Sequence, residues 1–502
     1  MCIHLKFKKS LHPSIQIAMA NTTPLIIRNL TSNRFELKVI ERFETLPTVK
    51  GVQGLSKNFT KLFNNSTASQ HEVSEGAQKF SHEEVSLPIE PLKTLKSDIK
   101  PPGPGIHALR LTFDAEGEQH RLDTPLPNDQ SAVLTPITPD PRFSYTAIYL
   151  PEHSHLTLYS SANLQSWMSK FKDETPLSAL SIPGTHNSPT CHKALPSVRC
   201  QATSPPEQLD NGIRFFDIRV QPEAPQDPSK DGLILVHAVF PISLTGNKYL
   251  KDLLKEVYAF LDHNPSETVI MSVKREGTGN ATDEQLSRIM RDHYAGDNNR
   301  WFTEPRIPTL GEARGKIVLI RRFALEGRLH DEWGGAGWCI DAATWEDNTP
   351  NATCPSGDVC VQDFYEVLET ENIDKKIQFS QEHLTRAAQC VCALPGSEEG
   401  HDDAPPKQPF FINFLTASNF WKVGCWPDRI AAKLNPAIVE FLCLKHNETE
   451  GVEGDAVEQA RKIGDGSTGI VVCDWVGQKG NWDIVRCVVG MNARLEMREH
   501  GL

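Results

Sequence analysis

Several features are missing from this chain of 502 residues, and each absence excludes a class of protein. No stretch approaches the roughly 18 consecutive apolar residues of a membrane-spanning helix, so we expect no transmembrane segment. A basic excess is also missing, because the formal net charge is −12. This charge argues against nucleic acid as a partner, since a nucleic-acid interface needs a basic face. It also argues against broad attraction to an anionic bilayer, so membrane contact should rely on local aromatic insertion.

Two further signals are incomplete. The His and Cys positions lack the paired short intervals of a zinc site. Residues 1–20 contain early lysines and an Ala-Met-Ala, but polar residues interrupt the apolar core that a signal peptide requires, and we treat 1–20 as a non-structural leader. Cys191 and Cys200 are placed to close a loop as a disulfide, and other pairings stay open. The Asn-x-Ser/Thr sequons favour secretion, whereas the incomplete signal-peptide pattern argues against it. The localisation is therefore undecided.

The first third of the chain has the alternation of β-strands. Residues 22–44 alternate apolar and polar side chains in two runs, which predicts half-buried antiparallel strands. Residues 50–105 are polar with little periodicity and are interpreted as an irregular insertion. Further strands are expected at His107–Phe113, Gln119–Leu122 and Tyr145–Tyr159. We therefore predict a small all-β, sandwich-like domain over 21–160, in which nothing looks catalytic.

From Leu164 the hydrophobic period changes to that of helices. The broad apolar stripe of 247–264 predicts a helix that stops before Pro265. Strands then alternate with helices, which is typical of parallel βα units. The strands are expected at Val269–Val273, Ile317–Ile320, Phe410–Phe414 and Gly469–Cys473, and the helices near 372–390, 429–446 and 482–494. The pattern predicts an α/β fold with a TIM-like (β/α) barrel over 161–502, with 326–361 and 395–409 as loop insertions.

Two short apolar runs near the start of this region deliver polar groups. Ala179–Pro183 is followed by His186, and Ile213–Val220 contains Asp217 and Arg219. The carboxyl ends of the strands are where an α/β barrel carries its chemistry. A single loop histidine is more often structural than catalytic. A catalytic role for His186 is therefore supported only when several motifs occur in the same order along the chain.

The run S-I-P-G-T-H, then G-x-R-x-F-D-I-R, then a strand that ends in His237, resembles the X domain of phosphatidylinositol-specific phospholipase C in its bacterial, single-barrel form. The resemblance begins near Trp167 and continues to the end of the chain, with NPSETVIMSVKRE, LGEARGKIVLIRRF and GIVVCDWVG in family order. It implies a distorted or incomplete TIM-like barrel. It also implies cleavage of a phosphodiester to diacylglycerol and inositol 1,2-cyclic phosphate.

The resemblance assigns catalytic roles residue by residue. His186 is the general base on the inositol 2-hydroxyl, oriented by Asp474, and His237 is the general acid, oriented by Asp217. Arg219 holds the phosphate through its planar guanidinium. Internal attack on phosphorus needs a base, an acid and cations at the phosphoryl oxygens, and two imidazoles near neutral pKa meet the first two needs.

The resemblance also assigns the headgroup contacts and the metal dependence. Lys274 and Arg322 would donate to ring hydroxyls, with Asp363 accepting and Tyr365 covering the ring face. Calcium-dependent relatives carry acidic residues at the positions held here by Arg219 and Lys274. Two cations in a would-be Ca²⁺ cage repel the ion, so we predict catalysis without metal or cofactor.

Two positions depart from the bacterial pattern. Asn187 stands where that pattern has Asp, and Ala238 stands where Gly is usual. An amide keeps a hydrogen-bond acceptor but loses the negative charge. We therefore expect reduced activity or a preference for another diester.

The loop 417–427, ASNFWKVGCWP, contains three aromatic residues near the expected strand ends. Phe420, Trp421 and Trp426 are interpreted as a membrane contact, because aromatic clusters on a rim suit an interfacial anchor. Core packing of these rings is the alternative. The expected partner is thus a phospholipid at a membrane surface.

Two other functions stay open. The first is a phosphodiesterase on the same barrel that acts on another lipid or on glycosylated phosphatidylinositol. The second is a non-enzymatic lipid-binding protein in which the barrel is a degraded scaffold. The presence of His186, His237, Arg219 and Asp474 together disfavours the second.

Overall fold

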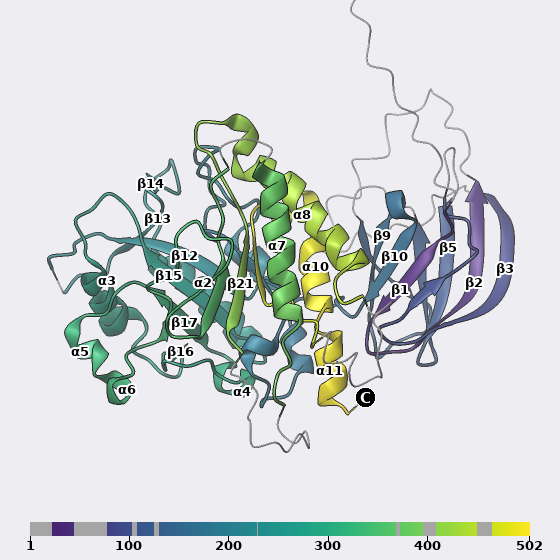
Figure 1. Cartoon of the computed structure of the whole chain (residues 1–502), viewed down its shortest axis with the longest axis horizontal. Helices are drawn as coiled ribbons and strands as arrows, with labels where there is room; N and C mark the ends of the chain where they lie inside the picture. The colour runs from purple at the N-terminus through teal and green to yellow at the C-terminus, as the bar shows by residue number, and fades with distance from the viewer. Residues whose placement is uncertain are drawn as a thin grey trace, which may run out of the picture.

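The structure is a computed structural model that describes residues 23–44, 78–102, 108–124, 130–227, 229–367, 372–394, 408–448 and 464–501. The predicted leader 1–20 and most of the predicted loop 395–409 lie outside these residues. Figure 1 shows the N-terminal strands on one side of the molecule and the larger sheet with most of the helices on the other. Within the described ranges, no helix is both long enough and apolar enough to cross a membrane.

The N-terminal part consists of two five-stranded sheets. The first holds, in order, β4 (Thr94–Lys96), β1 (Ile26–Leu30), β10 (His155–Tyr159), β9 (Thr146–Leu150) and β7 (Ser131–Val133). The second holds β3 (Gln78–Ile89), β2 (Phe35–Glu44), β5 (Ala108–Ala115), β6 (Glu118–Thr124) and β8 (Thr135–Pro136). Side chains from both sheets, among them Ile27, Phe113 and Leu156, form one hydrophobic core. The predicted all-β, sandwich-like part is confirmed.

Two details of the predicted sandwich are wrong. The expected irregular insertion 50–105 contains β3 and β4, and β3 pairs with β2 along its whole length. β3 is an edge strand with mostly exposed side chains, and apolar and polar residues alternate only in its last part, from Val85 to Ile89. β1 is almost wholly buried and pairs in parallel with β10, whereas we expected it to be half-buried and antiparallel.

The larger sheet supplies the scaffold of the C-terminal part. Its strands run in the order β16 (Trp301–Phe302), β17 (Ile317–Arg322), β15 (Val269–Arg275), β12 (Phe215–Pro222), β11 (Ile182–Thr185), β22 (Ile470–Cys473), β21 (Phe410–Leu415), β20 (Val359–Gln362) and β19 (Ala352–Thr353). All neighbours from β16 to β20 are parallel. Among the described strands the two ends of this path do not pair, so the barrel is curled but incomplete. The predicted fold class is confirmed.

Short strands extend this sheet at its rim. β13 (Leu233–His237) pairs antiparallel with β12 and with β14 (Phe240–Pro241), and β18 (Ile340–Asp341) pairs with β17. The predicted loop insertion 326–361 is wrong in part, because it contains α5 (Gly327–His330), α6 (Glu332–Gly335), β18, β19 and the start of β20. β20 has only four residues, and all of them are buried. It therefore shows neither the period of an amphipathic helix nor the alternation of a half-buried strand.

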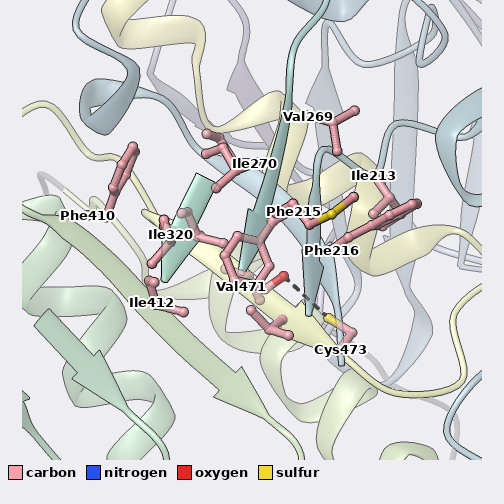
Figure 2. Packing of buried hydrophobic residues seen from close by; sticks show 14 of the residues in the cluster. Ile213, Phe215, Phe216, Val269, Ile270, Ile320, Phe410, Ile412, Val471 and Cys473 are labelled. Atoms are coloured by element: carbon pink, nitrogen blue, oxygen red, sulfur yellow. Dashed lines mark hydrogen bonds between the residues drawn. The ribbon is translucent and has the colours of Figure 1, made fainter. Parts of the chain in front are cut away.

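The strands of the barrel are apolar on both faces because both faces are covered. Figure 2 shows how Phe215, Ile270, Ile320 and Val471 from four strands pack together. These side chains are fully buried. This core fixes the strand ends, and with them the side chains that follow.

Helices cover the sheet. They are α1 (Pro205–Asp210), α2 (Leu250–His263), α3 (Asp283–Ile289), α4 (Leu310–Ala313), α7 (Asn372–Ala388), α8 (Pro427–Leu444), α10 (Asp483–Gly490) and α11 (Ala493–Glu499). Short 3₁₀ turns occupy Pro151–His153, Trp167–Lys170, Leu177–Ala179, Val423–Cys425 and Gln478–Gly480, and a π turn occupies Met290–Tyr294. α2 ends before Pro265, as predicted from its apolar stripe.

The two parts of the molecule are joined along α8 and α10, which lie between the sheets in Figure 1. The guanidinium of Arg28 donates to the carbonyl oxygens of Cys443 (2.9 Å) and His446 (2.7 Å). Asp483 accepts from the backbone N–H of Gln130 at 3.1 Å and from the Ser131 hydroxyl. Because the first sheet is covered on both faces, β9 and β10 are buried at every position.

Candidate active site

Polar side chains at the ends of four strands meet around one cavity. His186 follows β11, Arg219 lies near the end of β12, His237 ends β13 and Asp474 follows β22. The cavity has a volume of about 260 Å³. Its lining residues are His186, Arg219, His237, Ala238, Lys274, Glu276, Arg322, Asp347, Asp363, Tyr365, Thr416, Ala417 and Ser418.

This wall includes both predicted histidines, the predicted phosphate-binding arginine and all of the predicted headgroup residues. The other predicted catalytic residues, Asp217, Asn187 and Asp474, are buried behind the lining side chains. These three side chains do not line the cavity, so they can influence a bound substrate only through the neighbouring residues that they contact. The structure therefore brings the predicted site together in two layers.

His186 is held by a carboxylate. Its Nδ1 lies 2.9 Å from Oδ1 of Asp474, and the two side chains are 12% and 2% exposed. A carboxylate only accepts, so Nδ1 carries the hydrogen and Nε2 is free to exchange a proton. Burial lowers the pKa of His186, but the charge of Asp474 and the neighbouring Cys200 thiol outweigh it, and the pKa is well above its ordinary value. This pairing is the one that we predicted.

The side chain of His237 contacts groups other than the predicted carboxylate of Asp217. Its Nδ1 lies 2.8 Å from the carbonyl oxygen of Val198 and 3.7 Å from Sγ of Cys200. The ring centroids of His186 and His237 are 5.6 Å apart, and the two rings are nearly perpendicular, at 85°. Burial lowers the pKa of His237, but the Cys200 thiol raises it above the ordinary value. The predicted orientation of His237 by Asp217 is therefore wrong.

Asp217 is occupied by other donors. It is fully buried and accepts from the backbone N–H of Asn187 (3.0 Å), from Nε of Arg219 (3.1 Å) and from Nη1 of Arg322 (3.4 Å). Burial raises the pKa of Asp217, but the guanidinium of Arg219 and the other cations bring it well below its usual range. Arg219 also donates to Glu276 at 2.9 Å, so two carboxylates fix its guanidinium at the cavity wall.

Cys200 is a site residue that sequence reasoning placed in a different role. All described cysteines are free thiols, so the suggested bridge between Cys191 and Cys200 is wrong. Cys200 is fully buried beside the two imidazoles. Burial raises the pKa of its thiol, but His237 and His186 bring the pKa down to about 7. Nothing in the local sequence distinguishes this thiol from a small core residue.

The predicted headgroup residues are held by one another and by an aromatic ring. The guanidinium of Arg322 lies over the ring of Trp345 at 3.4 Å from the centroid. Its Nη2 is 3.9 Å from Oδ2 of Asp363, and burial raises the pKa of Asp363 although Arg322 acts against it. Nζ of Lys274 lies 3.4 Å from Glu276, which also binds Arg219. The cations of the cavity wall are thus positioned by carboxylates.

Several groups at or behind this wall were not predicted. Tyr365 donates to Asp347 at 3.0 Å, and both residues line the cavity. Lys376 from α7 is fully buried, and its Nζ donates to Gln362 at 2.8 Å. Burial lowers the pKa of Lys376 to about 7 in spite of nearby carboxylates, of which Asp363 is the strongest. Asp347 and Lys376 belong to none of the sequence motifs, so the sequence gives no signal for them.

The two departures from the bacterial pattern share a backbone conformation. Asn187 and Ala238 have φ angles of 43° and 50°. Asparagine tolerates this left-handed region, whereas alanine is strained there by about 1–2 kcal/mol. Both backbone N–H groups are used, because that of Asn187 donates to Asp217 and that of Ala238 donates to Glu276 at 2.7 Å. Among the described residues, neither polar atom of the Asn187 side chain has a hydrogen-bond partner.

The aromatic loop lies at the rim, where Ala417 and Ser418 join the cavity wall. Trp421 is 89% exposed and Phe420 is 37% exposed, whereas Trp426 is half-buried and donates its indole N–H to the carbonyl oxygen of Phe420 at 3.2 Å. Phe420 stacks on Phe240 of β14, with ring centroids 5.3 Å apart. Core packing therefore does not apply to Trp421.

Comparison with known proteins gives one consistent similarity. Residues 174–323 match the family model "Phosphatidylinositol-specific phospholipase C, X domain". A 1-phosphatidylinositol phosphodiesterase of Listeria monocytogenes is 36% identical over 171 residues, which cover 32% of this chain and 50% of that protein. A protein of the same name from Staphylococcus aureus is 26% identical over 302 residues, covering 58% of this chain and 86% of that protein. A solved S. aureus phosphatidylinositol-specific phospholipase C with incorporated pentafluoro-Phe aligns with a TM-score of 0.49 at 23% identity, covering 66% of this chain and 98% of that one.

Proposed function

Because residues 174–323 form an X domain of the phosphatidylinositol-specific phospholipase C family, we propose that this protein cleaves phosphatidylinositol to diacylglycerol and inositol 1,2-cyclic phosphate. The observation that carries the proposal is the meeting of two imidazoles and a guanidinium at one cavity. These are the groups that internal attack on a phosphodiester requires.

His186 acts as the general base. Its Nε2 takes the proton of the inositol 2-hydroxyl as that oxygen attacks phosphorus, and the carboxylate of Asp474 stabilises the imidazolium that forms. His237 acts as the general acid, giving its proton to the diacylglycerol oxygen as the bond from that oxygen to phosphorus breaks. One proton is taken and one is given, so the products are neutral diacylglycerol and a cyclic phosphate monoanion.

The guanidinium of Arg219 replaces a metal ion at the phosphoryl oxygens. It is positioned by Asp217 and Glu276. A guanidinium fixed in advance stabilises developing charge without reorganisation during the reaction. Reaction without Ca²⁺ is therefore part of the proposal.

The headgroup residues select an inositol ring. Lys274 and Arg322 donate to ring hydroxyls. Asp363 accepts from them, and Tyr365 covers one ring face. A headgroup without hydroxyls forms none of these hydrogen bonds, and a hydrogen bond to a charged group contributes about 1.5–3 kcal/mol. Phosphatidylcholine should therefore be a poor substrate.

Exposed apolar side chains at the rim of the cavity contact the membrane that contains the substrate. Trp421 and Phe420 are exposed at the rim, and Val239, next to the cavity residue Ala238, is 56% exposed. The stacked pair of Phe420 and Phe240 links the two loops that carry these residues. Insertion of apolar side chains suits a protein of net charge −12, which gains little from anionic lipid.

The test is turnover of phosphatidylinositol vesicles in the presence of a chelator, with phosphatidylcholine and a glycosylated phosphatidylinositol as the other substrates. We expect cleavage of phosphatidylinositol by the wild type and a loss of roughly 10²- to 10⁴-fold in His186→Ala and His237→Ala. His82→Ala, on the exposed edge strand β3, is the matched control and should keep full activity. Wild-type turnover no higher than that of His186→Ala would instead favour a lipid-binding protein.

A further inference from the structure

Three metal-ligating side chains meet at the cavity. His186, Cys200 and His237 each offer one ligand atom, and these atoms all lie within 4.8 Å of one another. Sγ of Cys200 is 3.7 Å from Nδ1 of His237, and both groups contact the carbonyl oxygen of Val198. His186 and Cys200 lie on the same loop between β11 and α1, and His237 ends β13. The ligands are therefore too far apart along the chain to show the paired short intervals of a zinc site.

The donor set is that of a thiophilic divalent ion. A thiolate and two imidazoles are typical ligands of Zn²⁺, whereas Ca²⁺ and Mg²⁺ prefer oxygen. Tetrahedral zinc with bonds of about 2.3 Å to sulfur and about 2.0 Å to nitrogen places those two atoms about 3.5 Å apart. The distance of 3.7 Å between Cys200 and His237 is already close to this value. Because all three ligand atoms already lie within 4.8 Å of one another, a small movement of His186 completes the set.

The surroundings also suit a bound ion. Asp474 holds Nδ1 of His186, an arrangement in which a carboxylate orients a zinc-bound imidazole and raises its basicity. Both imidazoles line the cavity, which provides an entry path and room for a water molecule as fourth ligand. The positive charges of Arg219 and Lys274 are offset by carboxylates, so they repel a bound cation only weakly. Arg219 is paired with Asp217 and Glu276, and Lys274 lies beside Glu276.

We propose that His186, Cys200 and His237 bind one zinc-class divalent ion, and that the ion switches the enzyme off. Binding releases the thiol proton and the Nδ1 proton of the His237 imidazolium to solvent, and Nε2 of His237 keeps its proton. The inhibition rests on the proposed function, because it follows from the use of His186 as the base. Asp474 holds Nδ1 of His186, so the ion binds Nε2, the nitrogen that takes the proton in that step.

The first experiment measures binding without substrate. Co²⁺ is titrated into the full chain, purified with chelator and reductant, and a thiolate-to-cobalt charge-transfer band is recorded, after which Zn²⁺ displaces the cobalt. We expect one equivalent of cobalt with this band in the wild type. In Cys200→Ser the band should be lost and the Zn²⁺ affinity should fall at least about 10- to 100-fold, the loss that even an outer-shell change causes.

Controls separate this site from other thiols and from misfolding. Cys191→Ser changes a partly exposed thiol of the same loop and should bind both ions like the wild type. Cys200→Ala is a second variant without the thiol, and circular dichroism confirms that each variant is folded. Unchanged cobalt spectra and zinc affinity in folded Cys200→Ser or Cys200→Ala would overturn the proposal, as would loss of the band in Cys191→Ser alone.

The second experiment distinguishes the metal site from the proposed activity. Phosphatidylinositol cleavage is measured over a range of Zn²⁺ concentrations. We expect the wild type to lose activity as the site fills, and Cys200→Ser to need at least about tenfold more Zn²⁺ for the same loss. Zinc binding through Cys200 without any lipid cleavage would leave the site standing and remove the proposed function. Full activity at saturating zinc would refute the switch.

Discussion

Removing the charge of the carboxylate that holds the proposed base should slow the chemical step. Asp474→Asn replaces this charge by a neutral amide of the same shape, 2.9 Å from Nδ1 of His186. The amide can still turn an oxygen toward Nδ1, so the ring position is largely kept. What is lost is the negative charge that stabilises the imidazolium formed when His186 takes the proton.

The size of the loss follows from the geometry. Two unit charges 2.9 Å apart interact by about 6 kcal/mol at an effective dielectric constant of about 20. Part of this loss is offset because the amide oxygen of Asn can still accept a hydrogen bond from Nδ1. We therefore expect the barrier to rise by roughly 3–6 kcal/mol, which lowers kcat by roughly 10²- to 10⁴-fold.

The assay is initial turnover of phosphatidylinositol in mixed micelles with saturating substrate, so that kcat and KM separate. Asp123→Asn is the matched control, because Asp123 forms a comparable, largely buried pair with Arg110 in the sandwich at 2.7 Å. It should keep the wild-type kcat and lose only stability. A kcat of Asp474→Asn within about threefold of the wild type, with KM unchanged, would refute the role of the carboxylate.

The rim, two buried histidines and a buried lysine offer further tests. Trp421→Ala should weaken vesicle binding by roughly 10- to 100-fold in a sedimentation assay, because a buried aromatic ring contributes about 1.5–3 kcal/mol. Trp333→Ala, in the short helix α6, removes another exposed ring and should leave vesicle binding unchanged. Equal losses in the two variants would contradict the role of Trp421 as a membrane contact. Burial lowers the pKa values of His155 and His446 to about 4, so the unfolded chain binds more protons than the folded chain below pH 6.5. The stability measured by urea unfolding should therefore fall as the pH drops from 6.5 to about 4, by up to about 3 kcal/mol for each histidine, and a flat profile would exclude this cause. Lys376→Met removes a buried amine behind the headgroup residues and should lower kcat/KM about tenfold while the melting temperature is kept; an unchanged kcat/KM would show that the site does not need this group.

The catalytic side of the site was predictable because its residues follow strand ends. His186, Arg219 and Asp474 each stand in or next to a short apolar run, and parallel strands bring their carboxyl ends to one edge of a sheet. The partner of His237 was not predictable in this way. It is a backbone carbonyl from the loop between β11 and α1, and a backbone group cannot be recognised from the residue type.

The misses in the fold have a related cause. β3 carries charged and exposed side chains because it is a sheet edge, and β20 is too short for its pattern to be seen. Both were assigned to irregular segments. Glu276 shows the same limit within the site, because only the fold reveals that this strand-end acid binds Arg219 and Ala238.

The different partners of the two imidazoles bear on which of them is the base. An imidazole that donates to a carboxylate is stabilised when it gains a proton, and His186 has Asp474 at 2.9 Å and Asp217 at 4.0 Å. His237 donates to the neutral carbonyl of Val198, and the cation of Arg219 acts against its protonation. The surroundings therefore stabilise the protonated form of His186 more than the protonated form of His237. This asymmetry favours attack on the side of His186 and departure of the leaving group on the side of His237, the direction in which the proposed reaction runs.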